Sequence, residues 1–217
     1  MFKLSRAQLI RCRGIIVWDF DGVLFETKRQ SMEYRRLLGA IGITEEAIVV
    51  ALKRLEKKNR LFSITGFIEE LNHKGKLFPA AMIRKIFHNN LVVNTYYDSK
   101  VDAMLHRLKR RGFIQLILSL GNAQWQRKKM FVGCGSSFPR HFARIYTTRR
   151  PKHFILSQIK KRFPDKPVIF VDDTEENLNL AKKHVPELIT VYYSNINGHS
   201  LDSLEKRIIS YVKQTGK

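Results

Sequence analysis

The sequence contains little cysteine, and this excludes several classes of small protein. Its 217 residues include two cysteines, Cys12 and Cys134, which lie far apart and lack the short spacing of a metal-binding pair. A disulfide-stabilised scaffold and a cysteine-ligated metal site are therefore not expected. We interpret both residues as reduced thiols and predict a cytoplasmic protein.

Long apolar stretches are also missing. No run approaches the roughly 18 apolar residues that a membrane-spanning helix needs. The longest runs, Gly14–Trp18 and Phe113–Leu120, have the length of strands. The first residues, MFKLSRAQLIRCRG, are basic but contain no apolar segment of the kind found in signal peptides. We therefore expect no membrane association and no signal peptide.

Acidic residues are scarce. The chain has 19 of them against 40 Lys and Arg, which gives a net charge of +21. The excess is uneven, because residues 101–160 contain 13 basic residues and one acidic residue, Asp102. A field of this sign attracts phosphate esters, nucleotides and nucleic acids. A basic surface that only contacts solvent would explain the same composition.

Apolar residues make up 44% of the chain, so a folded core is expected. Outside the middle of the chain, apolar strand-like runs alternate with segments of helical periodicity. The expected strands are Gly14–Trp18, Phe113–Ser119, Ala143–Tyr146, Val168–Val171 and Ile189–Tyr192. The expected helices are Asp102–Arg111, Gln124–Val132, Pro151–Arg162, Glu176–His184 and Leu201–Val212. This alternation predicts an α/β fold, a Rossmann-like parallel sheet with helices on both faces.

The middle of the chain has a different pattern. From about Gln30 to Asn94 the apolar residues recur with helical periodicity, and the first candidate for a strand is Leu91–Val93. We therefore predict two domains, an α/β core formed by residues 1–29 and 96–217 and a helical insert formed by residues 30–95.

Acidic and hydroxyl residues follow three of the expected strands. Asp19 and Asp21 follow the first, Ser119 closes the second, and Asp172 and Asp173 follow the fourth. In open α/β sheets, ligands bind beyond the carboxyl ends of the strands. Carboxylates about 4 Å apart repel by roughly 4 kcal/mol at an effective dielectric constant near 20, and a hard divalent cation such as Mg²⁺ removes that repulsion.

These residue types suit phosphoryl transfer. A carboxylate such as Asp19 can act as a nucleophile and form an aspartyl-phosphate. A second carboxyl group two residues later, Asp21, can donate and accept the protons of the reaction. Ser119 and Lys152 can neutralise the oxygens of the transferred group.

Four motifs in this order resemble those of the haloacid dehalogenase superfamily. The sequence IIVWDFDGVLF matches the first motif, and LILSLGN, with its serine at the end of a strand, matches the second. The third is a lysine at the start of a helix, in RRPKHFILSQI, and the fourth is the acidic pair of VIFVDDTEENL. In many relatives a proline follows the lysine, whereas here Pro151 precedes Lys152.

The resemblance implies a role for each matched residue of the first and fourth motifs. Asp19 would be the nucleophile and a metal ligand, and Asp21 the general acid and base, with its backbone carbonyl on the metal. Asp172 and Asp173 would be further ligands of Mg²⁺, and Asn177 would order their loop.

The other two motifs would bind the substrate. Ser119 would hold the transferring phosphoryl group, helped by backbone N–H groups near Leu120 and Gly121. Lys152 would neutralise the charge between Asp19 and that group. The helical insert would correspond to the cap that many relatives carry at this point, and it would influence the choice of substrate.

The resemblance therefore implies a Mg²⁺-dependent phosphatase, a phosphoric monoester hydrolase that acts on a small molecule. Relatives that act as dehalogenases lack the second aspartate, so Asp21 disfavours that chemistry. A mutase, another phosphotransferase or a phosphonate-cleaving enzyme remains compatible with the motifs. Nothing in the sequence indicates an oligomeric state.

A second hypothesis gives the protein a nucleic-acid partner, either as a polynucleotide-end phosphatase or as a basic binding module. It rests on the charge of residues 101–160 and on the aromatic residues between the cations, as in WQRKKMF and FPRHFARIY. A third hypothesis is a regulatory protein with a vestigial site, which the intact pair of Asp19 and Asp21 disfavours.

Overall fold

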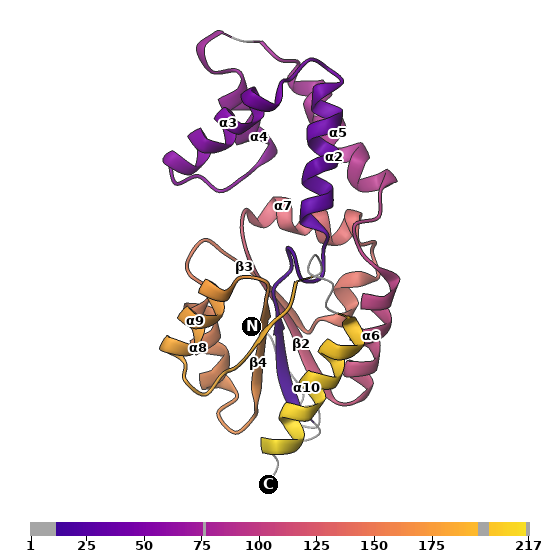
Figure 1. The fold of residues 1–217 in the computed structure, drawn as a ribbon, viewed down its shortest axis with the longest axis vertical. Helices are drawn as coiled ribbons and strands as arrows, with labels where there is room; N and C mark the ends of the chain where they lie inside the picture. The colour runs from indigo at the N-terminus through magenta and orange to yellow at the C-terminus, as the bar shows by residue number, and fades with distance from the viewer. Residues whose placement is uncertain (1–11, 76, 195–199, 216–217) are drawn as a thin grey trace. The chain divides into compact units, whose positions relative to one another are not determined.

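Two units make up the chain in this computed structural model, which describes residues 12–75, 77–194 and 200–215 (Figure 1). The expected absence of a signal peptide concerns residues outside the described part. The α/β unit comprises Met1–Glu26, Tyr97–Leu120 and Ser137–Lys217. The helical unit comprises Thr27–Tyr96 and Gly121–Ser136.

A five-stranded parallel sheet forms the centre of the α/β unit, with strand order β3-β2-β1-β4-β5. Its strands are β1 Gly14–Trp18, β2 Phe113–Leu120, β3 Arg144–Thr148, β4 Val168–Asp172 and β5 Ile189–Tyr192. Every residue of β1 and β4 is buried. Their uninterrupted apolar sequences therefore reflect strands covered on both faces.

Helices cover the two faces of this sheet (Figure 1). On one side lie α6 Ser99–Arg110 and α10 Leu201–Thr215, and on the other α8 His153–Arg162 and α9 Glu175–His184. A short 3₁₀ helix, Phe138–His141, precedes β3. The predicted Rossmann-like fold with helices on both faces is thus confirmed.

The helical unit contains four α-helices before β2 and one after it. These are α2 Thr27–Gly39, α3 Glu45–Lys57, α4 Ile64–Leu71, α5 Ala80–Val93 and α7 Ala123–Lys128. A 3₁₀ turn, His73–Gly75, follows α4, and a π-helical turn, Lys129–Gly133, extends α7. Aromatic rings hold the unit together, with Phe87 4.2 Å from Tyr34 and 5.8 Å from Trp125 between ring centroids.

One secondary-structure prediction in this unit was wrong. Leu91–Val93, the candidate strand, is the last turn of α5. Ile83, Phe87 and Leu91 are buried at intervals of four residues, whereas Val92 and Val93 are exposed, so the segment follows the helical period.

The helical unit also includes a second segment, Gly121–Ser136, which lies outside the predicted insert of residues 30–95. Trp125 accounts for this, since its ring packs against Tyr34, Phe62 and Phe87 of the first segment. Among the described residues, no helix combines the length and the apolar character that crossing a bilayer requires.

Candidate active site

The site is built where β1 and β4 end side by side. The register sets Trp18 opposite Val171, so the next residues, Asp19 and Asp172, are neighbours across the two strands. The backbone N–H of Asp19 donates to the carbonyl of Val171 at 2.8 Å and continues the ladder into the site. Both aspartates are buried, with 5% of Asp19 and 0% of Asp172 exposed.

Lys152 lies between these two carboxylates. It directly precedes α8, and its Nζ is 2.8 Å from Oδ2 of Asp19 and 2.7 Å from Oδ2 of Asp172. Burial disfavours the charged ammonium, but the two carboxylates outweigh this effect and raise the pKa of Lys152. Lys160, further along α8, instead donates to the carbonyls of Pro164 and Lys166.

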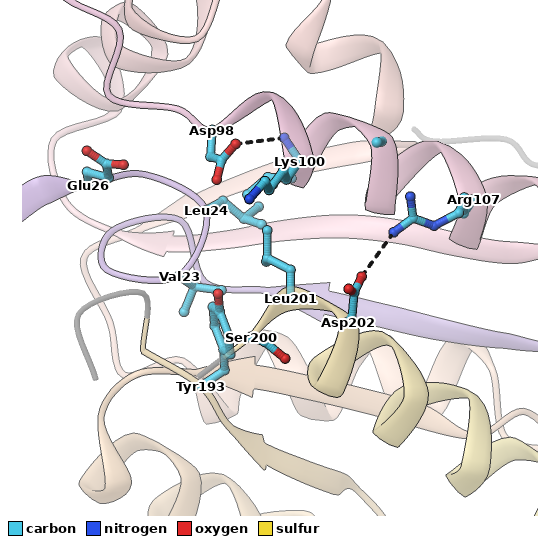
Figure 2. Close-up of a pocket in the computed structure, with 12 residues that line it drawn as sticks. Val23, Leu24, Glu26, Asp98, Lys100, Arg107, Tyr193, Ser200, Leu201 and Asp202 are labelled. Atoms are coloured by element: carbon cyan, nitrogen blue, oxygen red, sulfur yellow. Dashed lines mark hydrogen bonds and ion pairs between the residues drawn. The ribbon is translucent and has the colours of Figure 1, made fainter. Parts of the chain in front are cut away.

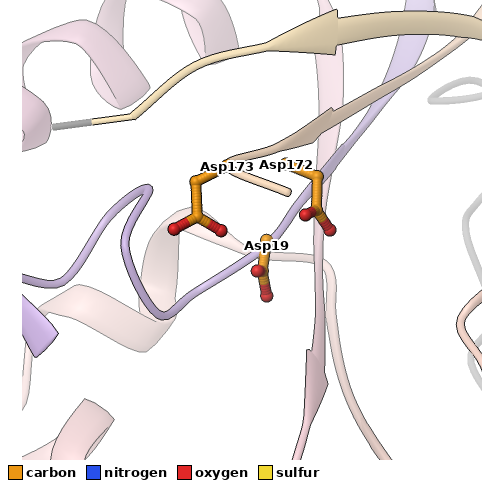
Figure 3. A group of neighbouring side chains, drawn as sticks. All are labelled: Asp19, Asp172 and Asp173. Carbon is orange, nitrogen blue, oxygen red and sulfur yellow. The ribbon is translucent and has the colours of Figure 1, made fainter. Parts of the chain in front are cut away.

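A third carboxylate completes the cluster. Oxygen atoms of Asp19, Asp172 and Asp173, one from each residue, lie within 4.8 Å of one another (Figure 3). Burial raises the pKa of Asp19 to about 7, and the carboxylates of Asp172 and Asp21 add to this rise, while Lys152 opposes it. Burial and the adjacent Asp172 likewise raise the pKa of Asp173.

Hydrogen bonds orient the carboxylates. Oδ1 of Asp172 accepts from the backbone N–H of Thr174 at 2.9 Å and from the side-chain amide of Asn177 at 3.1 Å. Oδ1 of Asp19 accepts from the backbone N–H of Phe20 at 2.7 Å. The other oxygen of each carboxyl group, Oδ2, contacts Lys152. Both carboxyl groups are therefore held in place before any ligand arrives.

Gly22 is a residue of the site that the sequence analysis did not identify. Its φ of +77° favours glycine, and a Cβ atom there would lie 1.9 Å from Oδ2 of Asp173. The backbone of the first motif therefore approaches the fourth motif so closely that only a hydrogen atom fits between them. The glycine that follows Asp21 was visible in the sequence, but its neighbour Asp173 was not.

Ser119 lies near the same edge of the sheet, on β2, which is the other strand that pairs with β1. The register sets Trp18 opposite Ile117 of β2, which puts Ser119 one residue beyond the level of Asp19. Its Oγ is buried and has no hydrogen-bond partner among the described residues. A buried hydroxyl without a partner is uncommon in folded proteins and suits a group that binds a ligand.

Three further residues were predicted from the sequence, Asp21, Leu120 and Gly121. Asp21 follows Asp19 by two residues, and its charge contributes to the raised pKa of Asp19. Leu120 is the last residue of β2 and is half exposed. Gly121, the first residue of the second helical segment, has a φ of +153°, and a Cβ there would lie 2.7 Å from Nε2 of Gln126.

A separate cavity of about 520 Å³ lies within the α/β unit, beside α6 and the start of α10 (Figure 2). Its charged side chains have both signs, including Asp98, Lys100 and Arg107. Arg107 also lies 3.8 Å from Asp202. None of the site residues predicted from the sequence lines this cavity, so the carboxylate cluster is the better candidate for a reaction centre.

The donor set of the cluster matches a hard divalent cation. Asp19, Asp172 and Asp173 could hold a metal ion, because one carboxylate oxygen of each lies within 4.8 Å of the others. The ammonium of Lys152 contacts two of these carboxyl groups, those of Asp19 and Asp172, so the cluster has more acidic groups than cations. At 4.8 Å each carboxylate pair repels by about 3 to 4 kcal/mol at an effective dielectric constant near 20.

Comparison with known proteins identifies the family. The model of the haloacid dehalogenase-like hydrolases matches residues 14–184. No curated protein matches the sequence.

Solved structures share the fold across most of the chain. One, from Burkholderia xenovorans LB400 and described as a haloacid dehalogenase-like hydrolase, has a TM-score of 0.68 at 15% identity and covers 91% of this chain and 97% of its own. A family enzyme of Bacteroides thetaiotaomicron, in complex with magnesium and inorganic phosphate, has 0.59 at 17% identity and covers 88% and 98%.

A third structure, the L-2-haloacid dehalogenase of Xanthobacter autotrophicus with chloropropionic acid covalently bound, has a TM-score of 0.58 at 14% identity and covers 91% of this chain and 82% of its own. Identities this low establish a common fold and leave the substrate open. The family model, in contrast, spans all four motifs, from β1 to the end of α9. The chain therefore belongs to the haloacid dehalogenase-like hydrolase family.

Proposed function

We propose that the protein is a Mg²⁺-dependent phosphatase that hydrolyses a phosphate monoester of a small molecule through an aspartyl-phosphate on Asp19. The observation that carries the proposal is the buried group of Asp19, Lys152 and Asp172, with Lys152 within 2.8 Å of both carboxylates. The second acid of the first motif, Asp21, supplies the proton transfers that phosphate ester hydrolysis needs.

The metal is proposed from the donor set. Asp19, Asp172 and Asp173 would hold Mg²⁺, and the backbone carbonyl of Asp21 would be a further ligand. The excess of carboxyl groups over cations favours a divalent cation, and oxygen donors are those that Mg²⁺ prefers. When bound, the ion would neutralise charge on the phosphoryl oxygens.

The residues divide the chemistry between them. A carboxylate oxygen of Asp19 attacks phosphorus and forms an acyl phosphate, while Asp21 gives its proton to the departing ester oxygen. Asp21, now ionised, then takes a proton from water, and the resulting hydroxide attacks phosphorus. The P–O bond to Asp19 breaks, inorganic phosphate leaves, and both carboxyl groups return to their initial state.

Binding of the phosphoryl group would fall to the second and third motifs. The buried hydroxyl of Ser119, which lacks a partner among the described residues, would donate to a phosphoryl oxygen. Backbone N–H groups of Leu120 and Gly121 would donate as well, and the ammonium of Lys152 would neutralise charge beside Asp19.

The fold alone does not separate a phosphatase from a dehalogenase, because structures with either ligand resemble this chain. The distinction between the two activities rests on individual residues of the site. A dehalogenase needs no proton for its halide leaving group and no metal, so Asp21 and the excess of carboxylates around Asp19 would have no use there. Both features favour phosphoryl transfer.

The helical unit is proposed as a cap that selects the substrate, since its longer segment is inserted between β1 and β2. Several basic side chains of this unit have acidic partners within it. Lys58 pairs with Glu70 at 2.6 Å, Arg60 with Glu69 at 2.7 Å, and Arg36 with Glu33 at 2.6 Å. Selection by shape is therefore favoured over selection by these charges.

A screen of phosphorylated metabolites and nucleotides with Mg²⁺ tests the proposal, with Asp19→Asn as the blank. We expect release of inorganic phosphate by the native protein only, from at least one phosphate monoester and from a generic aryl phosphate. EDTA should abolish the release and added Mg²⁺ should restore it. Activity that survives EDTA, or that persists in Asp19→Asn, would show that this mechanism is wrong.

A further inference from the structure

Basic residues gather at the amino edge of the sheet, where the parallel strands of the α/β unit begin. This edge is opposite to the one that carries Asp19. The set, called here the amino-edge row, consists of Arg13, Lys109, Arg110, Arg140, Arg144 and Lys166. All but the half-buried Lys166 are exposed, and each lies in, or directly next to, a turn that leads into a strand.

Hydrogen bonds link the segments that carry the row. Nζ of Lys109, before β2, donates to the carbonyl of Arg140, before β3, at 2.9 Å. The N–H of Arg13, before β1, donates to the carbonyl of Gly112, before β2, at 3.0 Å. The turn before β4 lies next to the start of β1, because the N–H of Ile15 donates to the carbonyl of Pro167 at 2.9 Å. Four adjacent strands at about 4.8 Å spacing give a row about 15 Å long.

The charge of the row is not neutralised by carboxylates. The partner of Lys109 is a neutral carbonyl, and the side chains of Arg13, Arg110 and Arg140 have no carboxylate partner in the part of the chain that the structure describes. The guanidinium of Arg144 lies over the ring of Tyr146, 4.7 Å from its centroid.

Three acidic residues lie near this edge. Glu205 is engaged by Arg107 at 2.7 Å and by Arg111 at 3.0 Å, and neither arginine belongs to the row. Asp165 is exposed in the turn before β4, and Glu187 is exposed in the turn before β5. The six cations of the row therefore share this edge with two acidic side chains, Asp165 and Glu187, that are not already paired with an arginine.

Helix stabilisation explains only part of the row. Lys109 and Arg110 lie in the last turn of α6, where cations interact favourably with the helix dipole. Arg13 and Arg144 lie at the starts of strands, which have no comparable dipole. An external anion accounts for all of these positions together.

Most of the row is too far from the carboxylate cluster to serve the same ligand. Arg144 is the member of the row nearest to the cluster, because it pairs with Leu116, which pairs with Val17 of β1. Six residues of extended chain separate Arg13 from Asp19, which corresponds to about 20 Å. The row also lacks the apolar side chains that membrane insertion uses. Among the described residues of this unit, the exposed large apolar side chains are Leu120 and Phe154, and both lie at the carboxyl edge.

We propose that the amino-edge row binds the phosphate backbone of a nucleic acid, without reading its bases. A row of about 15 Å matches the rise of roughly four nucleotides at 3.4 Å each, and a line of cations without exposed stacking surfaces suits phosphates rather than bases. The row would anchor the protein, while the carboxylate cluster about 20 Å away acts on a separate small substrate.

The test is a titration of the native protein against fluorescein-labelled single-stranded RNA and double-stranded DNA of about 20 nucleotides, read by anisotropy at several salt concentrations. The row variant is Arg13→Gln, Arg110→Gln and Arg140→Gln together. We expect its affinity to fall at least about 10-fold at low salt, and the slope of log K against log salt to decrease by about 3. Hydrolysis of an aryl phosphate should be unchanged.

A matched variant, Lys57→Gln, Lys85→Gln and Arg127→Gln, removes the same charge from exposed residues of the helical unit and should weaken binding less than about 3-fold. Substituting lysine at the three row positions should restore binding, which excludes a folding defect. If the row variant does not fold, Lys109→Gln with Arg144→Gln replaces it.

Three results would overturn the proposal: no binding by the native protein, equal weakening in the row and matched variants, or competitive inhibition of aryl phosphate hydrolysis by the oligonucleotide. Binding to phosphatidylserine vesicles without binding to RNA or DNA would also overturn it. Because binding is read without catalysis, failure of the row and failure of the proposed phosphatase activity are distinguishable.

Discussion

The two edges of one sheet carry opposite charges in different environments. At the carboxyl edge, Asp19 and Asp172 are almost completely buried around Lys152, and their oxygens are fixed by hydrogen bonds. At the amino edge, the cations of the row are largely exposed and mostly without charged partners. Burial strengthens electrostatic interactions and makes an unpaired charge costly, whereas solvent weakens both effects.

This contrast separates two uses of charge. A buried, pre-oriented cluster suits catalysis, because its groups need little reorganisation during the reaction. An exposed row of one sign suits a long, flexible polyanion, because each contact is weak and the sum depends on salt. Substitutions at the carboxyl edge should therefore alter stability and activity strongly, and those at the amino edge should not.

The largest effect is expected from Lys152→Met. Removing the ammonium leaves Asp19 and Asp172 buried without their cation, and losing one partner of a buried ion pair typically costs 3–5 kcal/mol. We expect a comparable loss in the free energy of unfolding of the metal-free protein and a loss of phosphatase activity of about 100-fold or more.

The matched substitution on α8 is Lys160→Met, which removes a lysine that contacts carbonyls only. It should change the free energy of unfolding by less than about 1 kcal/mol, as measured by denaturant titration. Equal effects of the two substitutions would contradict the proposed difference between buried and exposed cations.

The second effect is a pH dependence of stability. The pKa of Asp19 is raised to about 7 in the folded protein, against about 4 when unfolded. Between these values the native state binds the additional proton, so the stability of the metal-free protein should fall as pH rises from about 4 to about 7. We expect a decrease on the order of 3 kcal/mol, because each pKa unit corresponds to about 1.4 kcal/mol.

Chemical denaturation at a series of pH values, with EDTA present, measures this decrease. Asp19→Asn should flatten the profile in this range, since the titrating carboxyl group is gone. A native profile that rises with pH, or an Asp19→Asn profile that falls as steeply as the native one, would contradict the assignment to Asp19.

A smaller effect on stability is expected for Gly22→Ala. The new methyl group must displace the carboxylate of Asp173, because a Cβ would lie 1.9 Å from Oδ2. This carboxylate is the flexible end of its side chain, so the protein should lose only about 1 kcal/mol, chiefly through the positive φ, while the Mg²⁺ concentration needed for half-maximal activity rises about 10-fold.

Gly42→Ala is the control, because Gly42 has a φ of +81° but no atom within 4 Å of the added Cβ. It should lose a similar amount of stability and leave the Mg²⁺ requirement unchanged. If the Mg²⁺ requirement rose equally in both variants, the close approach of Gly22 to Asp173 could not be the cause of the rise.

The smallest effect on stability and activity is expected at the amino edge. The three Arg→Gln substitutions of the row should change the free energy of unfolding by less than about 0.5 kcal/mol and leave kcat/KM for an aryl phosphate unaltered. A marked destabilisation would mean that these arginines have structural contacts, and the two edges would then differ less than proposed.

The central strands were predictable from sequence because β1 and β4 are buried along their whole length. Gly14–Trp18 and Ile189–Tyr192 were predicted with the bounds that the structure has, and the strand ending at Asp172 was one residue longer than predicted. Parallel strands bring their carboxyl ends to one edge, so the proximity of Asp19 to Asp172 also followed from the pattern.

Features that depend on distant contacts were not predictable. The association of Trp125 with the helical unit depends on Tyr34 and Phe87, which lie far away in the sequence. Gly22 is required by the position of Asp173, about 150 residues later in the sequence. The charge of residues 101–160 was visible, but the row also takes Arg13 and Lys166 from outside that range. The catalytic roles of the site residues stay predictions.

The most direct test of the account follows the oxygen atoms of Asp19. An aryl phosphate is turned over repeatedly with Mg²⁺ in ¹⁸O-labelled water, and the peptide that contains Asp19 is analysed by mass spectrometry. Attack of water at phosphorus, which the account predicts, puts the label into the released phosphate and leaves Asp19 unlabelled, whereas attack at the carbonyl carbon would label Asp19. In the same reaction, rapid acid quenching during turnover should trap a phosphoryl group on Asp19. Phosphate release without a trapped phosphoryl group on Asp19, or with one on another residue, would contradict the central claim.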